Sequence, residues 1–250
     1  MSIVLITGAT SGFGRAIAMK FAEHGWNVIA TGRRKDRLEN LEKEITSTFE
    51  TKVFTLPFDV RNQKEVHHAI NALPHDWKII DVLVNNAGLA SGLSPIHEGE
   101  ISDWEVMIDT NIKGLLFVSN EIMPGMVERK KGHIVNIGSI AGKEAYAKGN
   151  VYCATKHAVD ALSKSMRIDL LLHSGSSKQS LCYLPLGAAG MLCHKLYNST
   201  ANGQRATWAD RAIKSVAARA VGFDSGWRRR NQGDPPLVPR QLVILDQGRL

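Results

Sequence analysis

A glycine-rich loop directly behind an apolar segment constrains the fold of this 250-residue chain more than any other feature. Residues 3–6 are a continuous apolar run, which is typical of a strand buried on both faces of a parallel sheet. Residues 7–14, Thr-Gly-Ala-Thr-Ser-Gly-Phe-Gly, follow at once, and apolar residues then recur at helical spacing from Ile17 to Ala22.

This strand, loop and helix predict a binding site for a dinucleotide pyrophosphate. Glycine lets the anion approach the main chain, and the N–H groups and dipole of a helix N-terminus attract it. A tight turn without a ligand is the alternative. The candidate cofactor-binding residues of the loop are Gly8, Thr10, Ser11, Gly12, Phe13 and Gly14.

Apolar runs and helical patterns alternate over the first 172 residues. Further strands are expected near residues 26–31, 53–56, 81–84 and 133–137, and further helices near 35–49, 66–73, 103–128 and 150–172. The alternation predicts the α/β class, with a doubly wound parallel sheet of the Rossmann type in a single domain.

Composition excludes several other classes of protein. No apolar run approaches the roughly 20 residues of a membrane span, and the first strand begins too early to leave room for a signal peptide. The cysteines Cys153, Cys182 and Cys193 have no disulfide or zinc spacing, and with His194 they give no reason to expect a metal. We therefore expect a reducing, cytoplasmic setting.

The end of the second expected strand bears on the choice of nucleotide. An acidic residue there would bind the ribose 2′-hydroxyl of NAD and repel a 2′-phosphate. This chain has Gly32 at that place, followed by Arg33 and Arg34, and guanidinium groups pair well with phosphate. We expect NADP as the cofactor. A solvated run of charge that continues into Lys35 is the alternative.

A tyrosine, a lysine and a serine form the candidate catalytic set. Tyr152 and Lys156 are four residues apart on an expected helix and so share a face, while Ser139 lies 13 residues earlier on the loop behind the fifth strand. A free tyrosine titrates near pH 10, and an adjacent ammonium group is expected to lower its pKa. Ser139 is placed to hydrogen-bond a substrate oxygen and hold it toward the tyrosine.

The glycine loop, Ser139 and the Tyr152/Lys156 pair together resemble the short-chain dehydrogenase/reductase family, over residues 3–172. The stretches 85–90 and 149–156 look most similar to NADP-dependent 3-hydroxy acid dehydrogenases of the serine/allo-threonine type. The resemblance implies an oxidoreductase that moves hydride between NADP(H) and a secondary alcohol or carbonyl. It also implies that the family's homo-oligomer forms.

The resemblance assigns roles to further residues. It implies that Asp59 and Val60 contact the adenine ring, although Asp59 also fits a plain capping aspartate. Asn86 would contact the nicotinamide ribose. Asn111 would be the fourth catalytic residue, which bends the long helix and anchors a proton-relay water to the lysine. A buried, hydrogen-bonded asparagine is the alternative for Asn111.

The pattern changes beyond residue 172. Residues 173–250 hold 11 basic and 4 acidic residues, which together account for the whole net charge of +7. We expect a linker over 173–180, a helix over 208–221 and a strand over 241–245. Over 181–190, where family members have a sixth strand that ends in Pro-Gly, the apolar strand pattern is degenerate. Leu186 interrupts the Pro-Gly that family members carry at this point.

We divide the chain into a Rossmann core, residues 1–172, and an atypical segment, residues 173–250. A change of reading frame is our hypothesis, and an unusual lineage-specific C-terminus is the alternative.

Two other functions stay open from the sequence. The atypical segment puts the substrate lid and the oligomer contacts in doubt, so the chain would then bind a nucleotide with impaired or no catalysis. Alternatively, the basic stretch Arg228–Arg230 would serve a nucleic-acid-associated sensor, since arginine clusters attract phosphate backbones. A salt-dependent gel shift that is lost on deleting residues 225–250 would favour the sensor.

Overall fold

The computed structural model describes residues 2–174 and 179–184. Within them, six strands form one sheet in the order β3-β2-β1-β4-β5-β6, and every neighbouring pair is parallel. The strands are β1 (Ile3–Ile6), β2 (Asn27–Gly32), β3 (Val53–Pro57), β4 (Val82–Asn85), β5 (Gly132–Ile137) and β6 (Gln179–Leu184).

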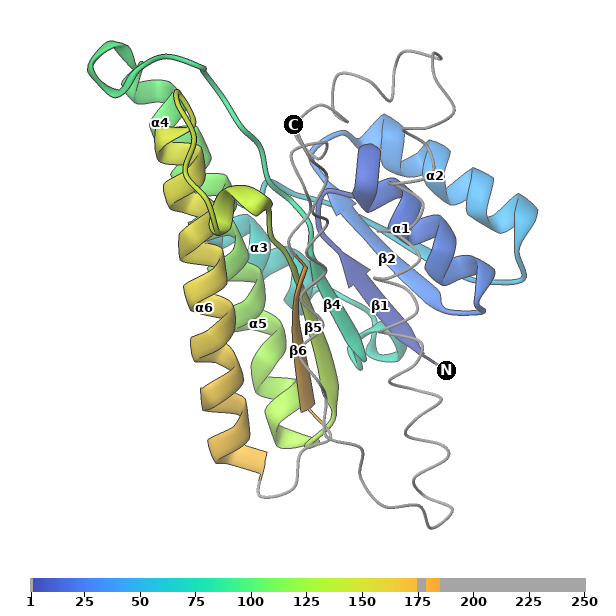
Figure 1. Cartoon of the computed structure of the whole chain (residues 1–250). Coiled ribbons are helices and arrows are strands. Elements are labelled where there is room, and N and C mark those ends of the chain that lie inside the picture. The colour runs from blue at the N-terminus through green and yellow to red at the C-terminus, as the bar shows by residue number, and fades with distance from the viewer. Residues whose placement is uncertain (1, 175–178, 185–250) are drawn as a thin grey trace, which may run out of the picture.

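Helices cover both faces of this sheet. In Figure 1, α1 and α2 lie on one side of the sheet, and α3, α5 and α6 lie on the other. The predicted doubly wound α/β fold is therefore confirmed. The helices are α1 (Gly12–Glu23), α2 (Lys35–Thr48), α3 (Gln63–Asn71), α4 (Ile101–Ile108), α5 (Leu115–Glu128) and α6 (Asn150–Ser174).

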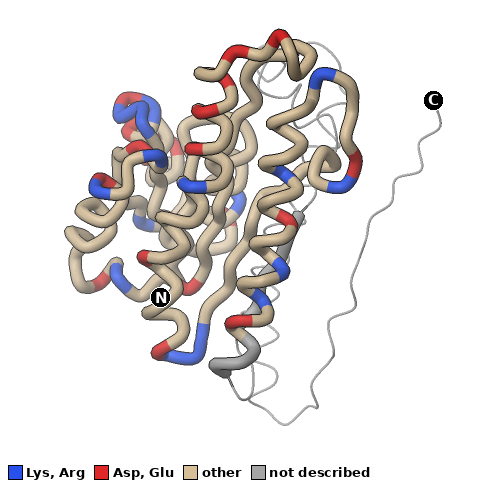
Figure 2. Tube along the Cα trace, turned by 90° about the vertical axis from the view of Figure 1, so that its left-hand side faces the viewer, with Lys and Arg blue, Asp and Glu red and all other residues tan. Residues whose placement is uncertain are grey.

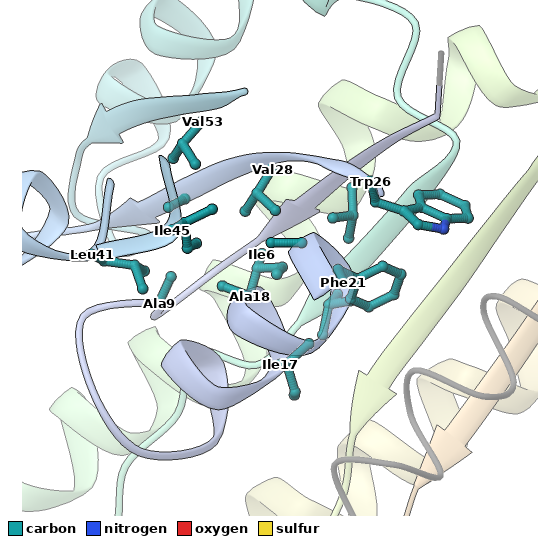
Figure 3. Close-up of a cluster of buried hydrophobic side chains, with 14 of the residues drawn as sticks. Ile6, Ala9, Ile17, Ala18, Phe21, Trp26, Val28, Leu41, Ile45 and Val53 are labelled. Atoms are coloured by element: carbon teal, nitrogen blue, oxygen red, sulfur yellow. The ribbon is translucent and has the colours of Figure 1, made fainter. Parts of the chain in front are cut away.

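The core beneath α1 and α2 fixes the strand from which the glycine loop leaves. Figure 3 shows apolar side chains of both helices converging on β1 and β2. Phe21 of α1 packs edge-to-face on Trp26, with ring centroids 5.3 Å apart. Leu41 and Ile45, on the predicted apolar stripe of α2, are buried. A fully buried side chain of this size contributes about 1.5–3 kcal/mol, so the scaffold of the loop is strongly held.

The order of the strands locates the site. From β1 the chain builds outward through β2 to β3, and then returns to the other side of β1 to form β4. Connections therefore leave the carboxyl ends of β1 and β4 in opposite directions, which opens a crevice where ligands of such sheets bind. The glycine loop and the Asn85–Gly88 turn both begin at this crevice.

The long helix predicted over residues 103–128 is interrupted. A π-helical turn, Asp109–Gly114, separates α4 from α5 and contains Asn111. Such wider turns are often found at functional sites. Gly114 packs closely on the loop behind β3, because an added Cβ would lie 2.7 Å from Val60 Cγ2. The turn buries Thr110, Asn111 and Gly114 rather than apolar side chains, and it lies where the family resemblance implied that Asn111 bends the long helix.

The structure corrects the prediction for the residues that follow the catalytic helix. Helix α6 continues to Ser174, and β6 pairs in parallel with β5 from Gly132↔Gln179 to Ile137↔Leu184. The linker expected over 173–180 is therefore too long, because residues 173–174 belong to α6 and residues 179–180 to β6. The sixth strand forms despite its degenerate pattern. Backbone pairing with a neighbouring strand outweighs a weak apolar pattern. The helix expected over 208–221, the strand over 241–245, Leu186 and the Arg228–Arg230 stretch lie outside the described residues.

Among residues 2–174 and 179–184, none of the helices is long and apolar enough to cross a membrane. Figure 2 shows Lys and Arg interspersed with Asp and Glu along the helices. This mixture contrasts with the basic excess of residues 173–250 in the sequence.

Candidate active site

The end of β1 is tied to the end of β4 by side chains. Thr7 Oγ1 accepts hydrogen bonds from the backbone N–H groups of Asn86, at 3.0 Å, and Ala87, at 2.9 Å. Asn86 Nδ2 donates to Thr7 O at 2.9 Å and to Gly8 O at 3.3 Å. Asn86 thus lies against the glycine loop. The hydrogen bonds of Thr7 were not predicted from the sequence. The position of Thr7, between the first strand and the first glycine, could have indicated a hydroxyl that bonds to a neighbouring strand end.

Two glycines of the loop are required for different reasons. Gly12 has a φ of +54°, in the left-handed region that other residues rarely adopt. Gly14 has no room for a side chain, because an added Cβ would overlap the carbonyl oxygen of Gly8 and lie 2.5 Å from Asn86 Nδ2. The loop therefore packs closely against its own backbone and against Asn86, with no room for a side chain at position 14.

The N-terminus of α1 is electropositive. Its N-cap residue, Ser11, makes no side-chain cap bond, and its first turn contains no acidic residue. The Ser11 and Thr10 hydroxyls instead accept hydrogen bonds from Arg34 NH2, at 3.0 Å and 2.6 Å. Because the helix dipole also favours negative charge here, the groups present suit a phosphate.

The two predicted arginines turn in different directions from the end of β2. Arg34 bonds to the glycine loop, whereas Arg33 NH1 lies 3.8 Å from Asp59 Oδ2, beyond the end of β3. Burial and the neighbouring charges of Arg37 and Arg33 lower the pKa of Arg34. An anion beside Arg34 would relieve this repulsion, so Arg34 suits a phosphate.

Asp59 is held by a residue that sequence reasoning missed. Asp59 Oδ2 accepts from Arg61 NH2 at 2.6 Å, and Oδ1 accepts from the Arg61 backbone N–H at 3.0 Å. Burial raises the pKa of Asp59, but the hydrogen bonds and charge of Arg61 outweigh it and hold this pKa below its ordinary value. The carboxylate is therefore fixed in place and ionised. Val60, beside it, is buried against Gly114.

Ser139, Tyr152 and Lys156 meet beyond the carboxyl end of β5. Ser139 caps a 3₁₀ turn, Ile140–Gly142, by accepting from the Ala141 N–H at 3.2 Å, and it is hydrogen-bonded to Tyr152. Lys156 Nζ donates to Ile137 O at 3.0 Å and lies 6.0 Å from the centre of the Tyr152 ring. The structure therefore brings the three predicted side chains together.

The electrostatics of this set differ from the prediction. Burial raises the pKa of Tyr152 above 10, although the Ser139 hydrogen bond lowers it in part. The lowering expected from Lys156 does not prevail. Burial also lowers the pKa of Lys156 from 10.5 to about 8, which weakens the cation that was expected to favour the phenolate.

Asn111 joins the π-helical turn to two other parts of the site. Its Nδ2 donates to Leu89 O at 2.8 Å and to Thr155 Oγ1 at 3.0 Å, and its Oδ1 accepts from the Leu89 N–H at 2.9 Å. A Cβ on Gly88 would lie 3.2 Å from Asn111 Oδ1 and 3.6 Å from Lys156 Nζ. The missing side chain of Gly88 thus keeps space between the asparagine and the lysine.

A buried polar network lies beneath these residues. Asn85 Nδ2 donates to Ser119 Oγ at 3.0 Å and to Asn136 Oδ1 at 2.9 Å, and Asn136 Nδ2 donates to Ser163 Oγ at 2.9 Å. The network joins β4, α5, β5 and α6. Asn85 Oδ1 is buried without a partner among the described residues, so the network is only partly satisfied. Its bonds still link the strands and helices from which the site residues project.

Comparison with known proteins gives one consistent family. A family model of the short chain dehydrogenases matches residues 2–174. The NADP-dependent 3-hydroxy acid dehydrogenase YdfG of Salmonella typhi is 54% identical over 168 residues, which are 67% of this chain and 66% of that protein. Sulfoacetaldehyde reductase 2 of Chromohalobacter salexigens is 46% identical over 169 residues, covering 67% of this chain and 66% of that protein. The matched part of the chain thus spans about two thirds of the length of these curated relatives.

Solved structures agree with the sequence matches. A serine dehydrogenase from Escherichia coli superposes with a TM-score of 0.70 at 42% identity, covering 81% of this chain and 93% of that one. The closed form of serine dehydrogenase complexed with NADP+ has a TM-score of 0.70 at 42% identity, covering 80% and 82%.

Proposed function

Because the chain belongs to the short-chain dehydrogenase family, we propose that it is an NADP-dependent oxidoreductase that interconverts a secondary alcohol and its carbonyl. A small 3-hydroxy acid is the proposed substrate class, as the names of the relatives at about half identity suggest. The observation that carries the proposal is the grouping of Ser139, Tyr152 and Lys156 beside the crevice between β1 and β4.

The groups of the crevice fit NADP along its length. The positive end of α1 and the close-packed glycines suit the pyrophosphate, and the two guanidinium groups suit the 2′-phosphate. When bound, NADP(H) supplies or accepts the hydride. The residues proposed to hold it are Gly8, Thr10, Ser11, Gly12, Phe13, Gly14, Arg33, Arg34, Asp59, Val60, Asn86, Tyr152 and Lys156.

Because NADP(H) carries the hydride, the side chains of the protein have to transfer a proton to or from the substrate oxygen. Ser139 donates a hydrogen bond to that oxygen and holds it near Tyr152 Oη. Tyr152 gives its proton to the oxygen during reduction and takes it back during oxidation, while Lys156 favours the phenolate. Burial of Tyr152 disfavours its phenolate, so positive charge must come closer to the phenolate oxygen to stabilise it. Each unit by which the pKa of Tyr152 falls requires about 1.4 kcal/mol of such stabilisation. Asn111 is proposed to position the proton relay next to Lys156.

Replacement of Tyr152 by phenylalanine tests this assignment. Turnover of a 3-oxo acid with NADPH should fall on the order of 10²–10⁴-fold, because a positioned acid–base group contributes that much. Tyr146→Phe is the control for a neighbouring tyrosine, since burial also raises the pKa of Tyr146 and its charge interacts with that of Tyr152, but it has no proposed role. A Tyr152→Phe variant that keeps most of the turnover would reject the assignment.

A nucleotide-binding protein with impaired catalysis is the second candidate function. It is kept because the sequence match ends after about two thirds of the relatives' length, although the family match favours the oxidoreductase. Tight NADPH binding by the full chain without turnover of any 3-oxo acid would support it, whereas an ordinary turnover rate would exclude it. A homo-oligomer and a cytoplasmic setting stay predictions.

A further inference from the structure

We infer that Thr10 is a specificity-determining residue of the nucleotide site. Its hydroxyl holds Arg34 where a ribose 2′-phosphate would bind, and its methyl group closes the space that an acidic side chain at position 32 would need. The inference rests on the proposed function, because it concerns the choice between NADP and NAD.

The first half of the inference follows from the bonds of Arg34. Arg34 NH2 donates to Thr10 Oγ1 at 2.6 Å and to Ser11 Oγ at 3.0 Å. Both bonds use the same guanidinium nitrogen, so they leave the donors on the other two nitrogens for a ligand. A guanidinium that is already oriented loses less side-chain entropy when it binds a phosphate.

The second half follows from the packing of Gly32. This residue ends β2 and is paired there with Pro57 of β3, and its carbonyl accepts from Phe58 N–H at 3.2 Å. An added Cβ would lie 2.7 Å from Thr10 Cγ2, but 3.7 Å from Thr10 Oγ1. The methyl group of Thr10 is therefore the obstacle to a side chain at this position.

The two roles are coupled because both groups sit on one Cβ. Rotation about χ1 that moves Cγ2 away from position 32 also moves Oγ1 away from Arg34. The loop itself is held against β2, since Ala9 N–H donates to Thr31 O at 2.9 Å, and Thr10 is buried. A side chain at position 32 and the hydrogen bond from Arg34 to Thr10 therefore exclude each other.

A double-mutant cycle with Gly32→Ala and Thr10→Ser tests this coupling. Gly32→Ala adds the obstructing methyl group without adding charge, and Thr10→Ser removes Cγ2 but keeps the hydroxyl. In the parent chain, Gly32→Ala should weaken NADP+ binding on the order of tenfold, the value of one charged hydrogen bond, and change NAD+ binding by less than about threefold. In the Thr10→Ser background, the same change should weaken NADP+ binding by less than about threefold. Equal effects in both backgrounds would overturn the inference.

The full chain is titrated calorimetrically with NADP+ and NAD+, and thermal unfolding checks that each variant is folded. Thr10→Val tests the hydroxyl without touching position 32, because valine keeps the branched shape and removes the acceptor. It should lower the ratio of NADP+ to NAD+ affinity on the order of tenfold, and an unchanged ratio would overturn the inference even if the Gly32→Ala variants did not fold. If the parent chain prefers NADP+ but the effects of Gly32→Ala and Thr10→Ser on NADP+ affinity are additive, the inference is rejected and the proposed cofactor stands. A parent that binds both nucleotides equally rejects the proposed cofactor as well.

Discussion

Replacing Gly14 by alanine should damage the nucleotide site far more than the same change at Gly12. At Gly14 the new Cβ overlaps the carbonyl oxygen of Gly8 and lies 2.5 Å from Asn86 Nδ2, so the backbone of the loop must move. Overpacking against a backbone that cannot rotate away should cost about 3 kcal/mol, at the upper end of the usual range. For a chain of this size, that cost corresponds to a fall in Tm of about 6–12 °C.

Gly12→Ala is the matched control because it isolates backbone strain. Gly12 has a φ of +54°, but nothing lies within 4 Å of the added Cβ. The expected cost is therefore about 1 kcal/mol, or about 2–4 °C in Tm. Gly14→Ala should also weaken NADP+ binding by more than about 30-fold, because separating Gly8 from Asn86 changes the shape of the loop. Thermal unfolding and calorimetric titration of both variants measure these quantities. Equal losses at the two positions would refute the packing argument.

Two further predictions follow from buried polar groups. Burial lowers the folded-state pKa of Lys156 from 10.5 to about 8, so its charge destabilises the folded protein fully below pH 8 and progressively less up to pH 10.5. The free energy of unfolding of the parent chain, relative to Lys156→Met, should therefore rise by about 3 kcal/mol between pH 7 and 10.5, and a constant difference in urea unfolding would contradict it. Asn111→Ala should lower the free energy of unfolding by about 2–3 kcal/mol, because it removes two hydrogen bonds to the half-buried backbone of Leu89 and one to the buried Thr155 hydroxyl. The exposed Asn71→Ala should cost less than about 0.5 kcal/mol, so similar losses in denaturant titrations would show that the Asn111 bonds do not stabilise the fold.

The alternation of apolar strands and amphipathic helices was enough to predict the sheet and the place of the site. Ile3–Ile6 and the stripe of α2 are buried as their patterns predict, because burial and periodicity have the same physical cause. The motif spacing likewise predicted that Ser139, Tyr152 and Lys156 would lie together.

Features set by tertiary packing were not predictable in this way. The π-helical turn at Asp109–Gly114 cannot be read from apolar spacing, because the residues that it buries are Thr110, Asn111 and Gly114, and β6 depends on pairing with β5 rather than on its own composition. The Asp59–Arg61 pair and the raised pKa of Tyr152 depend on burial and on distances between side chains. Such quantities exist only once the chain is folded.

The hydrogen bonds between Thr7 and Asn86 also bear on the order of events during folding. These residues are 79 positions apart, and three strands (β2, β3 and β4), three α-helices and one 3₁₀ turn lie between them in the chain. Closing so long a loop is slow, so the nucleotide site must form late, after β4 has docked beside β1. A ligand that contacts both the glycine loop after β1 and the turn after β4 binds only molecules in which these two strands are already paired. Nucleotide binding therefore reports on completed assembly, and excess ligand would favour that state by mass action.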